Sequence, residues 1–178
     1  MKKGFTMIEV MMAIFVLTTG IIAIYSLVPR IISLNSFNIN KFISSQLAIE
    51  GMEIIKNMRD GNWLEYRVST STPWNEGRIN DLEIEEGDYE VSYDMAGWED
   101  PSLDYCGLAE SCSYDDLKFL GKNSEGFYGY NYVSGNESRF KRKITVEKPE
   151  ADILEITTKV YWSEDKFFSV KERIYNWR

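Results

Sequence analysis

A single carboxylate, Glu9, lies at the start of a long apolar stretch close to the N-terminus. Two lysines and a glycine precede it, and residues 10–28 contain no charged side chain. A charge inside a membrane segment costs several kcal/mol and is usually retained for a partner or a pathway. The spacing therefore predicts a membrane helix in which the one acid has an electrostatic role.

The residues around this acid, KKGFTMIE at positions 2–9, resemble the processing segment of the type IV prepilin superfamily. That family includes pilus subunits and the pseudopilins of type II secretion and DNA-uptake machines. In it, a prepilin peptidase cuts a basic leader after glycine, and the new N-terminus is methylated. The resemblance implies cleavage between Gly4 and Phe5, N-methylation of Phe5, and docking into a filament through Glu9.

Cleavage after Gly4 would create a cationic α-amine on Phe5. Within one chain, this amine and Glu9 are about one helical turn apart. Between axially staggered chains, the amine of one subunit could instead neutralise Glu9 of its neighbour. An unpaired buried charge costs several kcal/mol, so such a pair would fix the register between subunits. The alternative is a Glu9 carboxylate that reaches the lipid headgroups and has no partner.

Two other interpretations of the N-terminus explain less of it. A secretory signal peptide also has a basic start, but no A-x-A-like site follows this run, which is longer than an ordinary signal core. A plain membrane anchor gives no reason for Glu9. Residues 10–28 rise about 28 Å as a helix, close to the hydrocarbon thickness. Lys2 and Lys3 predict a cytoplasmic N-terminus and an extracytoplasmic head. The family resemblance implies a surface location after assembly.

Cys106 and Cys112 are the only cysteines, and they lie in a loop rich in acids, glycine and serine. An extracytoplasmic location favours a disulfide between them. Two free thiols and a metal pair are the alternatives. The chain has no histidine and no second cysteine pair that could complete a zinc site.

Two charged clusters complete the search for binding chemistry. One cluster is acidic and matches no EF-hand spacing, so it predicts a solvated face and no metal site. Its members are Asp94, Glu99, Asp100, Asp104, Glu110, Asp115 and Asp116. The second cluster is basic and is interpreted as a guard on an edge strand or a row of ion pairs. It consists of Arg139, Lys141, Arg142 and Lys143, with Arg142 on the opposite strand face from the two lysines.

No catalytic motif is present. The sequence lacks a G-x-S-x-G elbow, a phosphate-binding loop and a dinucleotide fingerprint. It therefore predicts a protein that is not an enzyme and binds no cofactor. The family resemblance implies that a separate assembly ATPase and a membrane platform protein drive filament growth. The net charge of −8 disfavours binding to nucleic acid.

The predicted fold is α+β, a long N-terminal helix packed on a C-terminal antiparallel β-sheet head, as in the pilin fold. Five segments are expected. Residues 1–4 form the leader, 5–30 the transmembrane and filament-core half of the helix, and 31–60 its amphipathic half. Residues 61–178 form the head, in which 94–116 are an acidic, cysteine-containing loop.

Local signals set the expected element boundaries. Pro29 predicts a kink or local melting of the helix. Asp60 and Gly61 predict its end, with a left-handed glycine cap. Gly51 is unfavourable in a helix and is interpreted as allowing close packing against the sheet. Alternating apolar residues predict strands, and the clearest are a meander over 140–147, 153–162 and 167–175.

Together these features predict a minor pilin or pseudopilin, inserted in the membrane as a prepilin and assembled through its N-terminal helix with other pilin subunits. A major subunit is the alternative within the family. The alternative from another class is a membrane-tethered adhesion or binding domain that never polymerises.

Overall fold

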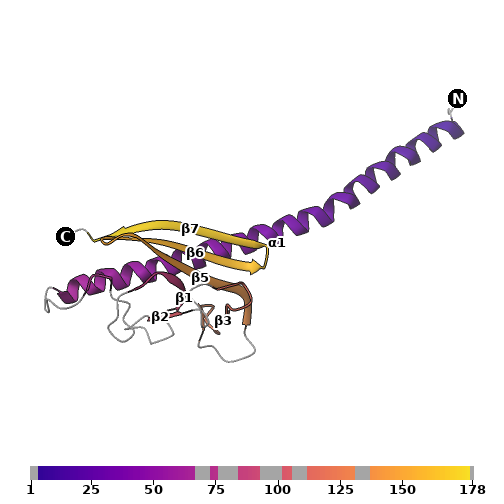
Figure 1. The fold of residues 1–178 in the computed structure, drawn as a ribbon. Helices are drawn as coiled ribbons and strands as arrows, with labels where there is room; N and C mark the ends of the chain where they lie inside the picture. The colour runs from indigo at the N-terminus through magenta and orange to yellow at the C-terminus, as the bar shows by residue number, and fades with distance from the viewer. Residues whose placement is uncertain are drawn as a thin grey trace. The chain divides into compact units, whose positions relative to one another are not determined.

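The computed structural model describes residues 4–66, 73–75, 84–92, 102–105, 112–130 and 137–176. The described part contains one helix, α1 (Met7–Tyr66), followed by seven strands. These are β1 (Gly87–Ser92), β2 (Ser102–Tyr105), β3 (Phe119–Lys122), β4 (Tyr128–Gly129), β5 (Glu137–Glu150), β6 (Ile153–Ser163) and β7 (Lys166–Tyr175). The predicted α+β fold, a long helix followed by an antiparallel sheet, is confirmed (Figure 1).

The chain divides into two compact units, Met1–Asn40 and Lys41–Arg178. In the first unit, residues 7–40 are helical and the side chains of residues 4–39 are exposed. The helix continues through Pro29, which excludes local melting and leaves a kink as the remaining prediction. Thr18, Thr19 and Ser26 donate hydrogen bonds to carbonyls of the preceding helical turn. These hydroxyls are therefore satisfied within the helix itself, as an apolar surrounding requires.

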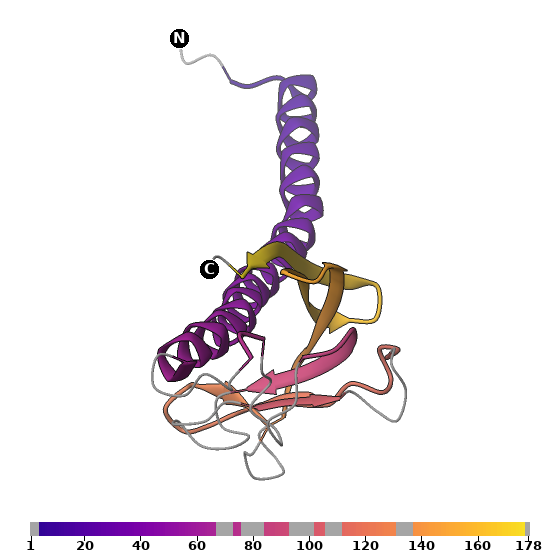
Figure 2. The same ribbon diagram turned by 60° about the vertical axis from the view of Figure 1, so that its left-hand side comes forward.

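The sheet of the second unit is built around β5. Strand β6 pairs with one edge of β5, and β1 and β3 pair with successive stretches of the other edge. Strands β2, β4 and β7 extend the sheet outward from β1, β3 and β6. Every pairing is antiparallel, and β5, β6 and β7 form the predicted C-terminal meander (Figure 2).

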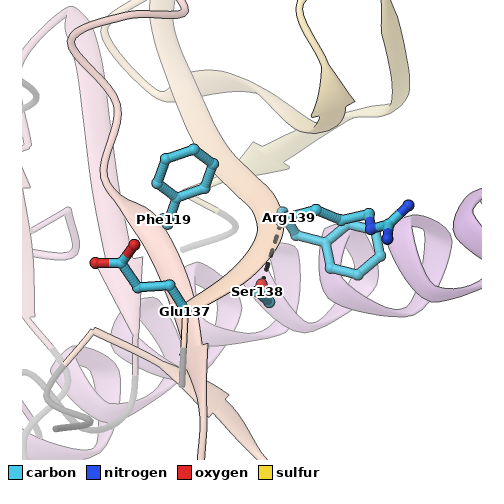
Figure 3. Close-up of a pocket in the computed structure, with 5 residues that line it drawn as sticks. Phe119, Glu137, Ser138 and Arg139 are labelled. Atoms are coloured by element: carbon cyan, nitrogen blue, oxygen red, sulfur yellow. Dashed lines mark hydrogen bonds between the residues drawn. The ribbon is translucent and has the colours of Figure 1, made fainter. Parts of the chain in front are cut away.

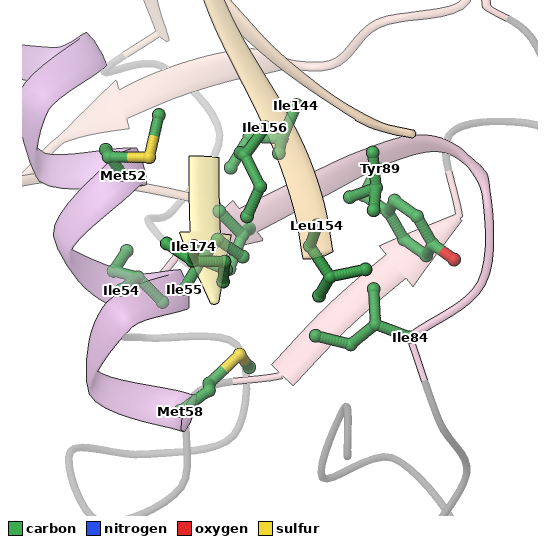
Figure 4. Close-up of a cluster of buried hydrophobic side chains, with 12 residues drawn as sticks. Met52, Ile54, Ile55, Met58, Ile84, Tyr89, Ile144, Leu154, Ile156 and Ile174 are labelled. Carbon is green, nitrogen blue, oxygen red and sulfur yellow. The ribbon is translucent and has the colours of Figure 1, made fainter. Parts of the chain in front are cut away.

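The C-terminal part of α1 packs on one face of this sheet, which we call the inner face. Met52, Ile55 and Met58 of the helix are buried against side chains from β1, β5, β6 and β7 (Figure 4). The sheet contributes Tyr89, Val91, Ile144, Val146, Leu154, Ile156 and Ile174. A second cluster packs Leu47 and Ala48 against Leu120, Phe140 and Val160. Apolar positions at helical spacing thus form the core that the sequence predicts.

Gly51 lies where helix and sheet approach most closely. A Cβ at this position would lie 3.0 Å from Cδ of Arg142 and 3.1 Å from Cγ2 of Thr158. The interpretation of Gly51 as a close-packing residue is therefore confirmed.

The helix extends further than predicted. It runs to Tyr66, so Gly61 is an internal helical residue and does not form the expected cap. The side chain of Asn62 is buried, and its Nδ2 donates a hydrogen bond to the carbonyl of Trp74 at 3.2 Å. The guanidinium of Arg59 lies 5.5 Å from the ring centre of Trp63. The contact between Asn62 and Trp74 is tertiary, so tertiary packing overrides the local stop signal.

Candidate functional site

The helix begins at the predicted processing segment. The carbonyl of Thr6 accepts hydrogen bonds from the N–H groups of Glu9 (3.1 Å) and Val10 (3.3 Å). Thr6 is therefore the N-cap residue, and Glu9 is the acid in the first turn. A carboxylate at this position is stabilised by the partial positive charge of the helix N-terminus.

Gly4 has no steric role in this chain. A Cβ on it would meet no atom within 4 Å. Phe5 is also largely solvent-exposed, at 83%. The described part of the chain therefore gives no packing reason for a glycine at position 4.

Glu9 lacks a counter-charge within the described residues. Its side chain is exposed, and no hydrogen bond or ion pair to its carboxylate is found in residues 4–66 or in the described parts of the head. The residues that follow it are apolar and equally exposed, among them Phe15, Leu17 and Ile22. An exposed apolar surface of this extent indicates a lipid or protein partner.

The helix also has the composition of a membrane span. Met7–Leu64 contains an 18-residue window with a mean hydropathy of 2.3, none of which is buried within the chain. A polar cap, one acid in the first turn and an exposed apolar stretch fit a membrane-anchored protein.

Comparison with known families identifies that N-terminus. Residues 1–25 match the family model of the prokaryotic N-terminal methylation motif. The segment is thus of the type IV prepilin and pseudopilin type, which confirms the resemblance seen in the sequence. Searches of curated proteins and of solved structures found no match. The match ends at residue 25, so the head is interpreted from its own structure.

The basic cluster of the sequence has a different role from the one predicted. All four members lie on β5, the strand from which the sheet extends in both directions, so the interpretation as an edge guard is wrong. Arg142 is fully buried on the inner face, at 0% exposure. It donates hydrogen bonds to the carbonyls of Leu47 (3.0 Å) and Val91, and its Nη1 lies 3.3 Å from Oε1 of Glu50. Arg142 therefore joins α1, β5 and β1.

Lys141 and Lys143 point to the opposite face of β5, which we call the outer face. There they meet residues 112–118, a segment that we call the strap. Lys143 forms an ion pair with Asp88 at 2.8 Å, and both contact the main chain of Cys112. The alternative of an ion-pair row is thus partly correct. The burial of Asp88 and Glu90 was missed, because the alternation with Tyr89 and Val91 suggests a solvated acidic face.

The cysteine pair is described on one side only. Cys112 is 9% exposed and begins the strap, and Cys106 lies outside the described residues. Most of the acidic loop also lies outside them. Among the described residues, no group of acids, cysteines or histidines could hold a metal ion.

A surface pocket of about 510 Å³ lies where β3 meets the start of β5. The main-chain N–H of Phe140 donates a hydrogen bond to Oγ of Ser138 there, at 3.1 Å (Figure 3). The side chains of Glu137 and Arg139 extend to opposite sides of the strand (Figure 3). Since its charged groups do not converge, we assign no chemistry to this pocket.

Proposed function

We propose that the protein is a structural subunit, a minor pilin or pseudopilin, of a type IV pilus or a type II secretion-like filament. In this proposal a prepilin peptidase cuts after Gly4, Phe5 is N-methylated, and the exposed helix leaves the membrane to pack against other pilin subunits. The observation that carries the proposal is the exposed Glu9, which has no counter-charge among the described residues, within a segment that matches the methylation motif.

The charge balance supports this assembly. Glu9 lacks a cation among the described residues, and cleavage after Gly4 creates one on every subunit. A charge pair in an apolar surrounding is tolerated only when both partners are present. Pairing between the Phe5 amine of one subunit and Glu9 of the next would thus favour one axial register.

The remaining partners follow from the same proposal. The head would lie outside the cytoplasmic membrane, and membrane lipid would cover the helix before assembly. Extension would need a platform protein in the membrane and a separate ATPase, because the proposed role of this chain is structural.

Processing provides the first test. The full chain is expressed in membranes with and without a prepilin peptidase, and its N-terminus is read by mass spectrometry. We expect a mature chain that begins at Phe5 and carries one added methyl group. Replacing Gly4 with valine should leave an uncleaved precursor. The matched control is Gly20→Val, because Gly20 also has open space around its Cα but lies away from the junction.

Polymerisation provides the second test. Cysteines introduced near Phe5 and Glu9, with both of these residues kept, should form crosslinks between subunits in assembled filaments. Normal processing without any such crosslink would favour a membrane-tethered binding domain. A chain that keeps its first four residues in the presence of the peptidase would overturn the proposal.

A further inference from the structure

The strap is attached to the outer face of the sheet by four charged side chains that all bind its main chain. Asp88 accepts a hydrogen bond from the N–H of Cys112 at 2.8 Å, and Lys143 donates to the Cys112 carbonyl at 3.1 Å. Lys141 donates to the carbonyl of Tyr114 at 3.0 Å. At the other end, Glu90 accepts from the N–H of Lys118 at 2.6 Å. The strap is therefore fixed at both ends.

These charges are buried to an unusual degree. Asp88 is 4% exposed, Glu90 1% and Lys141 5%. Buried charges are costly unless they are paired and hydrogen-bonded. The Asp88 carboxylate meets that condition, since it also accepts a hydrogen bond from the hydroxyl of Thr145 on its second oxygen. Its role is to hold the main chain of the strap, whose Cys112 and Leu117 side chains pack against Tyr161.

The attachment is tightest at Cys112, where both main-chain polar groups are bound. The N–H and the carbonyl of this residue meet Asp88 and Lys143, which are themselves paired. Because both groups are fixed, the direction of the Cα–Cβ bond is restricted as well. The described residues contain no free cysteine thiol, and Cys106 is the only other cysteine in the sequence.

We propose that Asp88 and Lys143 are positioning residues for a disulfide between Cys112 and Cys106. Their hydrogen bonds to the Cys112 main chain make this disulfide resistant to reduction. The proposal rests on the cysteine pairing and is independent of filament assembly. Fixing one cysteine in advance lowers the entropy lost when the ring closes, so the oxidised state gains relative to the dithiol.

The chemistry is thiol–disulfide exchange with an external disulfide as oxidant. The thiolate of one cysteine attacks a sulfur of the oxidant, which forms a mixed disulfide and releases one thiolate. The thiolate of the second cysteine then attacks the protein sulfur of the mixed disulfide and releases the second thiolate. Both leaving thiolates take up the protons lost by the cysteines. The protein loses two electrons, and the oxidant gains them.

The ionisation state of Asp88 suits its role as a positioning residue. Burial raises the pKa of Asp88, but hydrogen bonds from Lys143, Thr145 and the Cys112 N–H outweigh burial and hold the pKa below its usual range. Asp88 therefore stays ionised at neutral pH. The hydrogen bond from the Cys112 N–H to the Asp88 carboxylate therefore persists near neutral pH.

The test is a redox titration of the full chain in detergent. The protein is equilibrated with glutathione buffers of known ratio, trapped by alkylation, and its thiols are counted by mass spectrometry. We expect Asp88→Asn and Lys143→Met each to lower the equilibrium constant for disulfide formation about tenfold, which corresponds to about 30 mV. Thr145→Val removes only one hydrogen bond to Asp88 and should give a smaller shift in the same direction.

Two controls separate positioning from general stability. Lys159→Met changes a lysine that pairs directly with Lys143 in the β5–β6 register but does not bind the strap. Ile156→Val weakens the core of the inner face. Neither should shift the redox equilibrium while the head stays folded. If Asp88→Asn does not fold, Lys143→Met and Thr145→Val decide the test.

Equal equilibrium constants for disulfide formation in the wild type and in the folded Asp88→Asn, Lys143→Met and Thr145→Val variants would overturn the proposal. A shift in Ile156→Val as large as that in Lys143→Met would also overturn it. Two alkylatable thiols in aerobically purified protein would remove the disulfide itself, and this result would leave the filament proposal untouched.

Discussion

Glu9 and Asp88 are two carboxylates that meet opposite conditions within one chain. Glu9 lies in the N-terminal unit, exposed on an apolar helix, and no described residue binds its carboxylate. Asp88 lies in the head, nearly buried, and receives hydrogen bonds from Lys143, Thr145 and the Cys112 main chain.

The difference lies in the source of the groups that stabilise each carboxylate charge. The described part of the head supplies partners to its buried charged side chains Asp88, Glu90, Lys141 and Arg142, although Nε of Arg142 has none. In the N-terminal unit, Glu9 has no counter-charge among the described residues and the apolar side chains of its helix are exposed. Its stability in an apolar surrounding therefore depends on groups from outside the chain, which is the property expected of an assembly segment.

The largest effect should follow from removing the unsatisfied acid. Glu9→Ala should leave cleavage after Gly4 intact and lower incorporation into filaments at least tenfold, because the amine of the neighbouring subunit loses its counter-charge. Breaking a buried pair costs about 3–5 kcal/mol. Quantitative immunoblotting of sheared filaments against the processed membrane pool measures the ratio.

Glu9→Gln is the matched control for shape. It keeps the side-chain size but not the charge, so it should assemble as poorly as Glu9→Ala. Wild-type levels of either variant in filaments would show that Glu9 is not needed for docking.

A smaller effect, confined to the head, should follow from removing its most buried cation. Arg142→Ala should lower the free energy of unfolding by about 2–4 kcal/mol, because Glu50 and two main-chain carbonyls lose their partner. Urea unfolding of the full chain in detergent, followed by tryptophan fluorescence, measures the loss. Processing at Gly4 should not change.

Arg139→Ala supplies the comparison on the same strand. Arg139 is exposed, so its replacement should stay within about 0.5 kcal/mol of the wild type. Equal losses in the two variants would mean that the buried contacts of Arg142 contribute no more than a surface charge.

Arg142 also shows what sequence reasoning could and could not predict. The apolar helix, the meander and the inner-face position of Arg142 follow from local periodicity, which is visible in a single segment. Whether β5 is central or at an edge depends on its pairing with β1 and β3, which are distant in sequence. The basic cluster was misinterpreted for that reason.

Contacts between distant segments also explain why the burial of Asp88 and the true end of the helix were not predicted. Asp88 alternates with apolar residues, which is typical of a strand with one solvent-exposed face. Only the packing of the strap on that face makes it a buried acid. Gly61 is a local stop signal, but Asn62 reaches the carbonyl of Trp74 through tertiary structure. The processing segment was predictable because its signal is contiguous.

The smallest and most specific effect concerns pH. The pKa of Asp88 lies below its ordinary value of 3.8, since hydrogen bonds to the carboxylate outweigh its burial. A lowered pKa stabilises the fold at pH values above the unfolded pKa, and this contribution is lost as the pH falls through the folded pKa. Asp88→Asn should therefore cost about 1–3 kcal/mol at pH 7. The gap to the wild type should shrink below about pH 4.

Glu155 provides the contrast within the head. Hydrogen bonds from Lys171 and Arg173 lower its pKa to about 2. Both partners are exposed, and surface pairs contribute little because water and salt screen them. Glu155→Gln should thus cost less than Asp88→Asn at pH 7, and its effect should fall further in high salt. Unfolding curves from pH 7 to pH 2 test both variants. If the difference in unfolding free energy between wild type and Asp88→Asn stays constant in acid, the charge of the Asp88 carboxylate does not stabilise the head. The contrast between Asp88 and Glu9 would then lose its energetic basis.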